Sequence, residues 1–106
     1  MKKVAFETVL HGEPTFGVRV ALWPESTLKD AETVLDRHRT IRIEFGYPLP
    51  DRHVCDFSHQ GSWTRKDFVD AVVAKYREIG DAEVDDLWLE TAYRDDGGVW
   101  RLGMGG

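Results

Sequence analysis

The sequence contains one cysteine and no long apolar run, and each shortage excludes a class of protein. A single thiol, Cys55, excludes an internal disulfide and agrees with a reducing compartment. Every apolar stretch is shorter than the ~18–20 residues that cross a membrane. The run after Met1-Lys2-Lys3 is interrupted by Glu7 before it resembles a signal peptide. We therefore expect a cytoplasmic protein with no membrane partner.

Several motifs of enzymes and ligand-binding proteins are also missing. The sequence has no phosphate-binding loop, no Rossmann glycine pattern, no G-x-S-x-G elbow and no H-E-x-x-H zinc motif. Its net charge of −5 is the opposite of the lysine and arginine surplus that binds nucleic-acid phosphates. We expect no enzyme activity, no catalytic residues, no cofactor, no metal and no nucleic-acid partner.

The charge is unevenly distributed along a chain that has the size of one domain. The 106 residues contain no low-complexity segment or linker, so residues 1–106 are predicted to form a single domain. Acidic residues dominate from Glu78 to Asp96, whereas Arg37, Arg39 and Arg42 form a basic cluster. The acidic stretch indicates either solvated surface loops or an acidic face that attracts a basic partner.

Residues 40–59 are predicted to form a β-hairpin. Ile41, Ile43 and Phe45 alternate with Arg42 and Glu44, which is the pattern of a half-buried strand. A turn rich in proline follows, and the chain returns as a second strand over residues 52–59.

Residues 64–79 are predicted to form a helix. Thr64 and Asp67 have the spacing of a capping box, and Gly80 is placed to end the helix. An apolar stripe lies between them at helical spacing. It consists of Phe68, Val69, Ala71, Val72, Val73, Tyr76 and Ile79.

The flanking segments complete the predicted fold. Alternating apolar residues predict strands over 3–10 and 16–22, and capping residues with apolar spacing predict a helix over 27–37. Two further strands, 87–94 and 99–102, flank an Asp-Gly turn. The order ββαββαββ predicts an α+β fold, with one antiparallel sheet of about six strands and two helices packed on one face.

One strand carries residues that could support chemistry. The strand positions of His53, Cys55 and His59 differ by two and by four, so these side chains share one face of the strand. A thiolate between two imidazoles could bind zinc or act as a nucleophile. The spacing is not a standard zinc signature, and burial of Cys55 and Phe57 on the core face of the strand is the favoured explanation. A small enzyme or metal site is therefore only the third hypothesis for function.

The last predicted hairpin carries the residues of the leading hypothesis. Trp88 is predicted to share a sheet face with Glu90, beside the acidic residues Asp85 and Asp86, and Trp100 to lie across the hairpin from it. Tryptophan on a polar face is typical of a protein-binding anchor. We therefore expect a non-enzymatic domain that binds a protein partner with a basic surface. A homodimer through an exposed edge strand is a weaker form of this hypothesis.

An alternative comes from resemblance. Residues 41–102 follow the order strand, strand, helix, strand, strand, which resembles the β-grasp of ubiquitin-like proteins. The chain ends in Gly105-Gly106, which resembles the diglycine of a ubiquitin-like modifier. This resemblance implies that Gly106 is activated by an adenylating enzyme and joined to a lysine or to sulfur.

Overall fold

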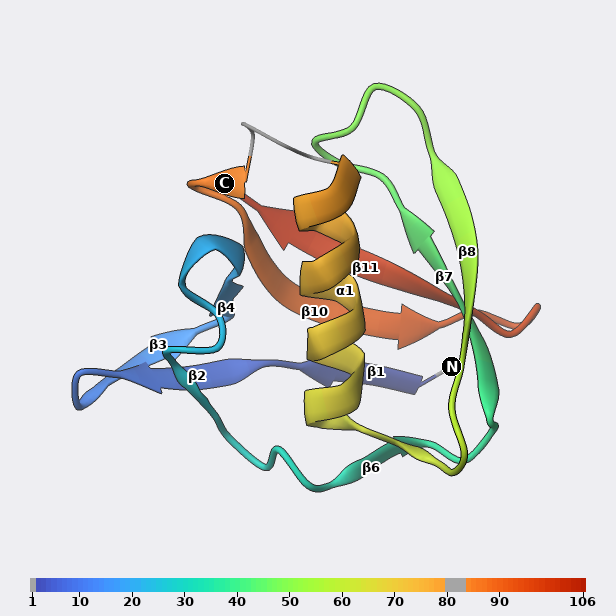
Figure 1. Ribbon diagram of the computed structural model, residues 1–106, viewed down its shortest axis with the longest axis horizontal. Coiled ribbons are helices and arrows are strands. Elements are labelled where there is room, and N and C mark those ends of the chain that lie inside the picture. The colour runs from blue at the N-terminus through green and yellow to red at the C-terminus, as the bar shows by residue number, and fades with distance from the viewer. Residues whose placement is uncertain (1, 80–83) are drawn as a thin grey trace.

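The computed structural model describes residues 2–79 and 84–106. These residues form eleven strands, one α-helix and one 3-10 turn, η1 (Figure 1). In chain order the elements are β1 (Lys2–Ala5), β2 (Glu7–Leu10), β3 (Glu13–Phe16), β4 (Val18–Arg19), η1 (Val20–Leu22), β5 (Thr27–Leu28), β6 (Val34–Asp36), β7 (Thr40–Phe45), β8 (His53–Ser58), β9 (Trp63–Thr64), α1 (Arg65–Ile79), β10 (Trp88–Arg94) and β11 (Val99–Gly105).

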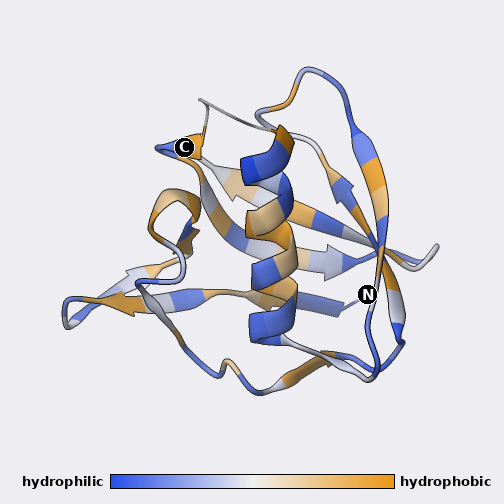
Figure 2. Ribbon diagram, viewed as in Figure 1, coloured by the Kyte–Doolittle hydropathy of each residue, from blue (hydrophilic) through white to orange (hydrophobic). Residues whose placement is uncertain are grey.

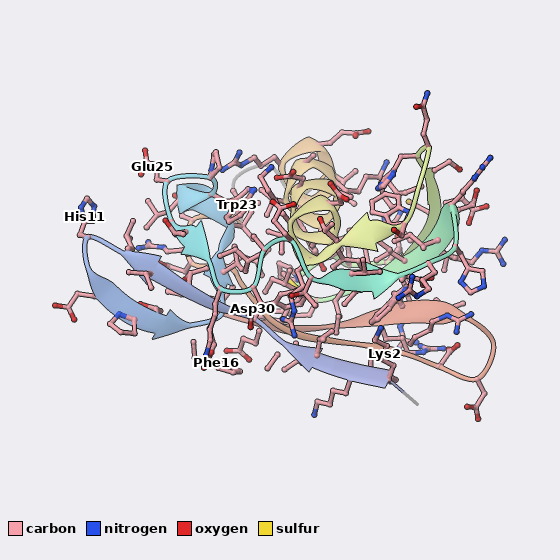
Figure 3. The ribbon with its side chains drawn as sticks, turned by 90° about the horizontal axis from the view of Figure 1, so that it is seen from below. Lys2, His11, Phe16, Trp23, Glu25 and Asp30 are labelled. Atoms are coloured by element: carbon pink, nitrogen blue, oxygen red, sulfur yellow. The ribbon has the colours of Figure 1, made fainter. Side chains whose placement is uncertain are left out.

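The largest sheet has six strands. Its order is β1-β10-β11-β7-β8, and the short β4 also pairs with β10. All neighbours are antiparallel except β11 and β7, which run parallel near the middle of the sheet. Figure 3 shows that α1 lies over one face of this sheet only. We call the face without the helix the open face.

The core lies between α1 and the six-stranded sheet. Ile41, Ile43 and Phe45 alternate with more exposed residues along β7, so the strand directs its apolar side to the helix. Figure 2 shows this alternation of hydrophobic and hydrophilic residues along the strands. The helix contributes a stripe at helical spacing, which consists of Phe68, Val69, Val72, Val73 and Tyr76.

The predicted helix over 64–79 is confirmed in position and in its N-terminal cap. The Thr64 backbone N–H donates to Asp67 Oδ2 at 3.0 Å, and the Asp67 N–H donates to Thr64 Oγ1 at 3.1 Å. Trp23 anchors η1 to the helix, because its indole N–H donates to Asp70 Oδ1 at 2.9 Å. Gly80, the predicted end of the helix, lies outside the described residues. No helix of the described residues is long and apolar enough to cross a membrane.

A smaller sheet extends from the large one (Figure 1). It has three strands in the order β3-β2-β5, and β2 continues nearly in line from β1. Phe6 separates β1 from β2 and is fully buried. The turn between β2 and β3 contains His11 at φ 51° and Gly12 at φ 79°. The predicted strand over 3–10 is therefore two strands, and the predicted strand over 16–22 is divided among the last residue of β3, β4 and η1.

The predicted fold class is wrong in the number of sheets and of helices, and the large sheet is not wholly antiparallel because β11 and β7 run parallel. The described strands form three sheets rather than one, and the described residues contain one α-helix rather than two. Residues 27–37, predicted to be helical, instead contain β5, a turn and β6. Asp30 has a φ of 55°, in the left-handed region, which a right-handed helix cannot include.

The backbone bonding of this segment explains why it does not form a helix. The carbonyls of Ala31 and Thr33 accept hydrogen bonds from the backbone N–H groups of Lys66 and Arg65, at 3.0 and 2.9 Å. The first N–H groups of a helix have no partner within it and need acceptors from elsewhere. Ala31 and Thr33 thus supply acceptors to α1, while the Thr33 N–H donates to the Asp30 carbonyl at 3.0 Å and closes a turn.

A β-bulge changes which residues of β10 face the core. Leu89 pairs with Met104 and Thr91 pairs with Gly103, which leaves Glu90 as an extra residue. Leu89 and Ala92 are therefore both buried, although they are three positions apart. Strict alternation along this strand, which would place Leu89 and Ala92 on opposite faces, therefore fails beyond Glu90.

Candidate functional site

The acidic and aromatic residues singled out in the sequence gather at one end of the six-stranded sheet, around the start of β10. Asp85 and Asp86 precede the strand and are exposed. Arg19 of β4 connects them to the sheet: its Nε donates to the Asp85 carbonyl at 3.1 Å, and its Nη2 lies 3.5 Å from Asp86 Oδ1. The Asp86 side chain is 89% exposed, so this ion pair is weak and open to solvent.

Trp88 and Glu90 lie beside these acids and are half-buried. Trp88 pairs with Gly105 on one side and with Arg19 on the other. A Cβ added to Gly17 would lie 3.4 Å from the Trp88 ring, and one added to Gly105 would lie 2.6 Å from Glu90 Oε2. The two glycines therefore allow these larger side chains to lie close against the neighbouring backbone.

Tyr47 belongs to the same surface and was missed in the sequence, because the turn it occupies gave no sign of its neighbours. It is 62% exposed. A Cβ added to Gly106 would lie 3.2 Å from Tyr47 Oη and 3.4 Å from the Asp86 carbonyl oxygen. The C-terminal glycine thus lies between Tyr47 and Asp86. We call Tyr47, Asp85, Asp86, Trp88 and Glu90 the acidic end of the sheet.

Trp100 is not part of this surface. It is fully buried on the helix side of β11, where its ring packs against Phe68 at a centroid distance of 5.3 Å. Its register partner is Arg94, at the opposite end of β10 from Trp88. The structure therefore removes Trp100 from the predicted binding residues and places it in the core.

The indole of Trp100 leads to a buried carboxylate that the sequence did not indicate. Trp100 Nε1 donates to Asp36 Oδ2 at 2.9 Å. Asp36 Oδ1 accepts from the His38 backbone N–H at 2.9 Å and lies 2.7 Å from His38 Nδ1. Burial alone would raise the pKa of Asp36, but these hydrogen bonds outweigh it and hold that pKa below its ordinary value. Asp36 is therefore a buried anion with hydrogen-bond partners on both of its oxygens.

The histidines and cysteine of the third hypothesis are separated by their packing. Cys55 is partly buried against the core, whereas His53 is exposed. His59 stacks on Trp63 at a centroid distance of 4.1 Å, and its Nε2 lies 3.4 Å from Asp67 Oδ2 at the start of α1. Within the described ranges, no three histidine, cysteine, aspartate or glutamate side chains are placed to hold a metal ion together.

The diglycine of the alternative hypothesis is partly inside the sheet. Gly105 is the last residue of β11 and pairs with Trp88. Gly103, two residues earlier, pairs with Thr91. Only Gly106 lies beyond the strand.

Comparisons with known proteins identify no relative of this chain. The chain matches no protein-family model, no curated protein and no solved structure.

Proposed function

We propose that this protein is a non-enzymatic domain that binds another protein through the acidic end of its sheet. The observation that carries the proposal is the exposure of Tyr47 and Asp86, which lie on either side of Gly106 at the start of β10. Aromatic side chains supply much of the binding energy in protein interfaces, while charged groups around them select the partner. The partner would present a basic surface to Asp85, Asp86 and Glu90.

The composition of the surface supports this partner chemistry. Asp85 contributes its carbonyl, rather than its carboxylate, to Arg19, and Asp86 meets Arg19 only at 3.5 Å. In the described part of the chain, Arg19 is the one cation in contact with these acids. The acidic charge at this end is therefore largely uncompensated within the molecule and available to a cation on a partner.

A charge-reversal experiment tests the proposal. Affinity capture from extract of the source cells would compare the wild type with Asp85→Lys/Asp86→Lys. The control is Glu32→Lys/Asp96→Lys, which changes the net charge equally at two exposed residues, one just before β6 and one at the opposite end of β10 from Trp88. We expect a protein partner that binds the wild type and the control and is lost from the first variant. A partner captured equally by all three forms would place the interface elsewhere.

Tyr47→Ala tests the aromatic contribution separately from charge. Because the Tyr47 side chain is largely exposed, its loss should leave the thermal unfolding temperature nearly unchanged. If Tyr47 is an anchor, the affinity for the captured partner should fall by about 2 kcal/mol or more, measured by calorimetric titration. Unchanged affinity would remove Tyr47 from the interface. Trp88→Ala is less suitable as a first test, because Trp88 packs against Gly17 and its loss would also disturb the fold.

The modifier hypothesis makes a different demand on the same end of the molecule. An activating enzyme would need Gly105 and Gly106 in an extended, accessible tail. Gly105 is paired with Trp88, so the last residue pair between β10 and β11 would have to separate before activation. For this reason we place the binding function first and the modifier second.

A further inference from the structure

A cleft of about 250 Å³ opens at the other end of β10, beside the buried Asp36. Three cations from separate segments line it: Lys2 of β1, Arg37 just after β6, and Arg94 at the end of β10. Asp36 and Trp100 lie at its inner side and complete the polar wall. We call this the cationic cleft.

The cations outnumber the carboxylate that faces them. Asp36 accepts its hydrogen bonds from His38 and Trp100, and Arg94 Nε remains 3.8 Å from Asp36 Oδ2, which is too far for a hydrogen bond. Lys2 donates to the Leu35 carbonyl. Among the described residues, neither Arg94 nor Arg37 donates a side-chain hydrogen bond. Two guanidinium groups at the cleft therefore have N–H donors available for a ligand.

We propose that the cationic cleft binds a small oxyanion with two negative charges, of which inorganic phosphate is the test case. Guanidinium groups present paired N–H donors that match the oxygens of phosphate and carboxylate groups. The cleft is smaller than the pockets of ~300–1,000 Å³ that enclose drug-sized ligands, so it fits an ion or a small molecule rather than a nucleotide. The excess of positive charge at the cleft favours a dianion over a monoanion.

The buried Asp36 offsets part of the positive charge of the cleft, because it is an anion 3.8 Å from Arg94 Nε, but three cations still face this one carboxylate. Its oxygens point to Trp100 and His38, so the carboxylate fixes the wall of the cleft and does not occupy the guanidinium donors. A plain surface cluster of lysine and arginine would have no such fixed wall. The site thus combines a fixed wall with two guanidinium groups that donate no side-chain hydrogen bond within the described residues.

Titration of the full chain with phosphate at constant ionic strength tests the site. The Trp100 indole N–H resonance reports on the cleft, because this group donates its hydrogen bond to Asp36 in the cleft wall. We expect a saturable shift of this resonance with phosphate and with sulfate. Acetate should bind with an affinity at least about tenfold lower. A shift of the same size with chloride would mean charge screening only and would overturn the proposal.

Two substitutions locate the binding. Arg94→Gln should weaken phosphate binding by about tenfold or more, since it removes the guanidinium and keeps most of the apolar stem. Arg37→Gln, at an exposed residue, gives the same test if Arg94→Gln fails to fold. The matched control is Arg42→Gln, because Arg42 pairs with Asp56 at 2.8 Å on the open face, outside the cleft. Equal loss of binding in Arg42→Gln and the cleft variants would overturn the assignment, as would unchanged binding in the cleft variants.

Discussion

Asp36 shows how a single side chain connects distant parts of this molecule. Its carboxylate joins the end of β6 to Trp100 on β11, which lies 64 residues further along the chain. The hydrogen bonds from Trp100 and His38 stabilise the ionised form, which is why the pKa of Asp36 is held below its ordinary value despite burial. A carboxyl group with a lowered pKa in the folded state stabilises the fold above its unfolded pKa of about 3.9. This stabilisation is lost as the pH falls below that value.

Asp36→Asn should therefore lower the free energy of unfolding by about 2 kcal/mol near neutral pH, because charged hydrogen bonds to Trp100 and His38 are lost. The difference from the wild type should shrink at acid pH, as the pH falls through the lowered pKa of Asp36 and its carboxylate becomes protonated. Urea denaturation at neutral and at acid pH measures both effects. Asp96→Asn, at an exposed residue, is the control and should change stability by less than about 0.5 kcal/mol. A difference that persists in acid would contradict the assigned role of the ionised carboxylate.

The role of Asp36 could not be predicted from the sequence. The segment around it predicted a helix, in which Asp36 would lie on the solvated side. Its partner Trp100 was predicted to lie on the binding surface, and no local pattern relates two residues so far apart. By contrast, Asp85 and Asp86 are neighbours of Trp88 in the chain, so their proximity to it needs no long-range pattern.

At the scale of elements, α1 is the best-determined part of the fold. Its capping box and its apolar stripe are both local, and both are readable in the sequence. The N–H groups of Arg65 and Lys66 find their acceptors in residues 31–33, and no local pattern in the sequence indicates these acceptors. The helix was therefore predictable, whereas the conformation of the segment that caps it was not.

Thr64→Ala should destabilise the protein by about 1 kcal/mol, since it removes the acceptor for the Asp67 N–H at the helix start. The neighbouring Ser62→Ala is a suitable control, because Ser62 makes no side-chain hydrogen bond within the described residues. Chemical denaturation of the two variants gives the comparison. Equal stability of the two variants would show that the bonds from residues 31–33 suffice to cap the helix.

The pairing of β10 with β11 rests on a close contact between Thr91 and Gly103. A Cβ at position 103 would lie 2.2 Å from Thr91 Oγ1, so Gly103→Ala forces Thr91 to move. We expect a loss of about 1–3 kcal/mol in the free energy of unfolding. In the Thr91→Ala background the hydroxyl that would clash is absent, so adding Gly103→Ala there should cost much less stability than it costs in the wild type. Gly61→Ala, where a Cβ would meet nothing within 4 Å, is the matched control in the same denaturation series.

The bulge in β10 explains the limits of the sequence pattern for this hairpin. Alternation correctly predicted strands here, because Leu87 and Leu89 recur with period two. The inserted Glu90 then shifts the period by one residue, and the face of every later residue changes with it. No feature of the sequence marks the position of that insertion.

At the scale of the whole molecule, β11 holds the two halves of the chain together. It lies between β10 and β7, so residues 99–105 contact strands from before and after α1. We expect backbone order parameters of about 0.85 for Gly103 and Gly105, as in rigid structure, measured by nuclear magnetic relaxation. Values below about 0.6 would indicate a free tail and would favour the modifier hypothesis over the binding function. Truncation after Met104 tests the same point, because loss of Gly105 should lower stability if the pairing with Trp88 is maintained in solution.

The two ends of β10 differ in charge, and this has a consequence for how the protein moves in solution. Asp85, Asp86 and Glu90 lie near Trp88 with Arg19 as their one cation among the described residues. About 20 Å away along the strand, the cations around Arg94 slightly outnumber the acids, the former being Lys2, Arg37, Arg94 and Arg101 and the latter Asp36, Asp95 and Asp96. Such a separation is an electric dipole, on which the field of a charged particle exerts a torque. The protein would therefore rotate to present its acidic end to a polycation and its cationic cleft to a polyanion before contact. At 0.1 M salt the field decays over ~10 Å, so this alignment would be confined to the last moments of approach.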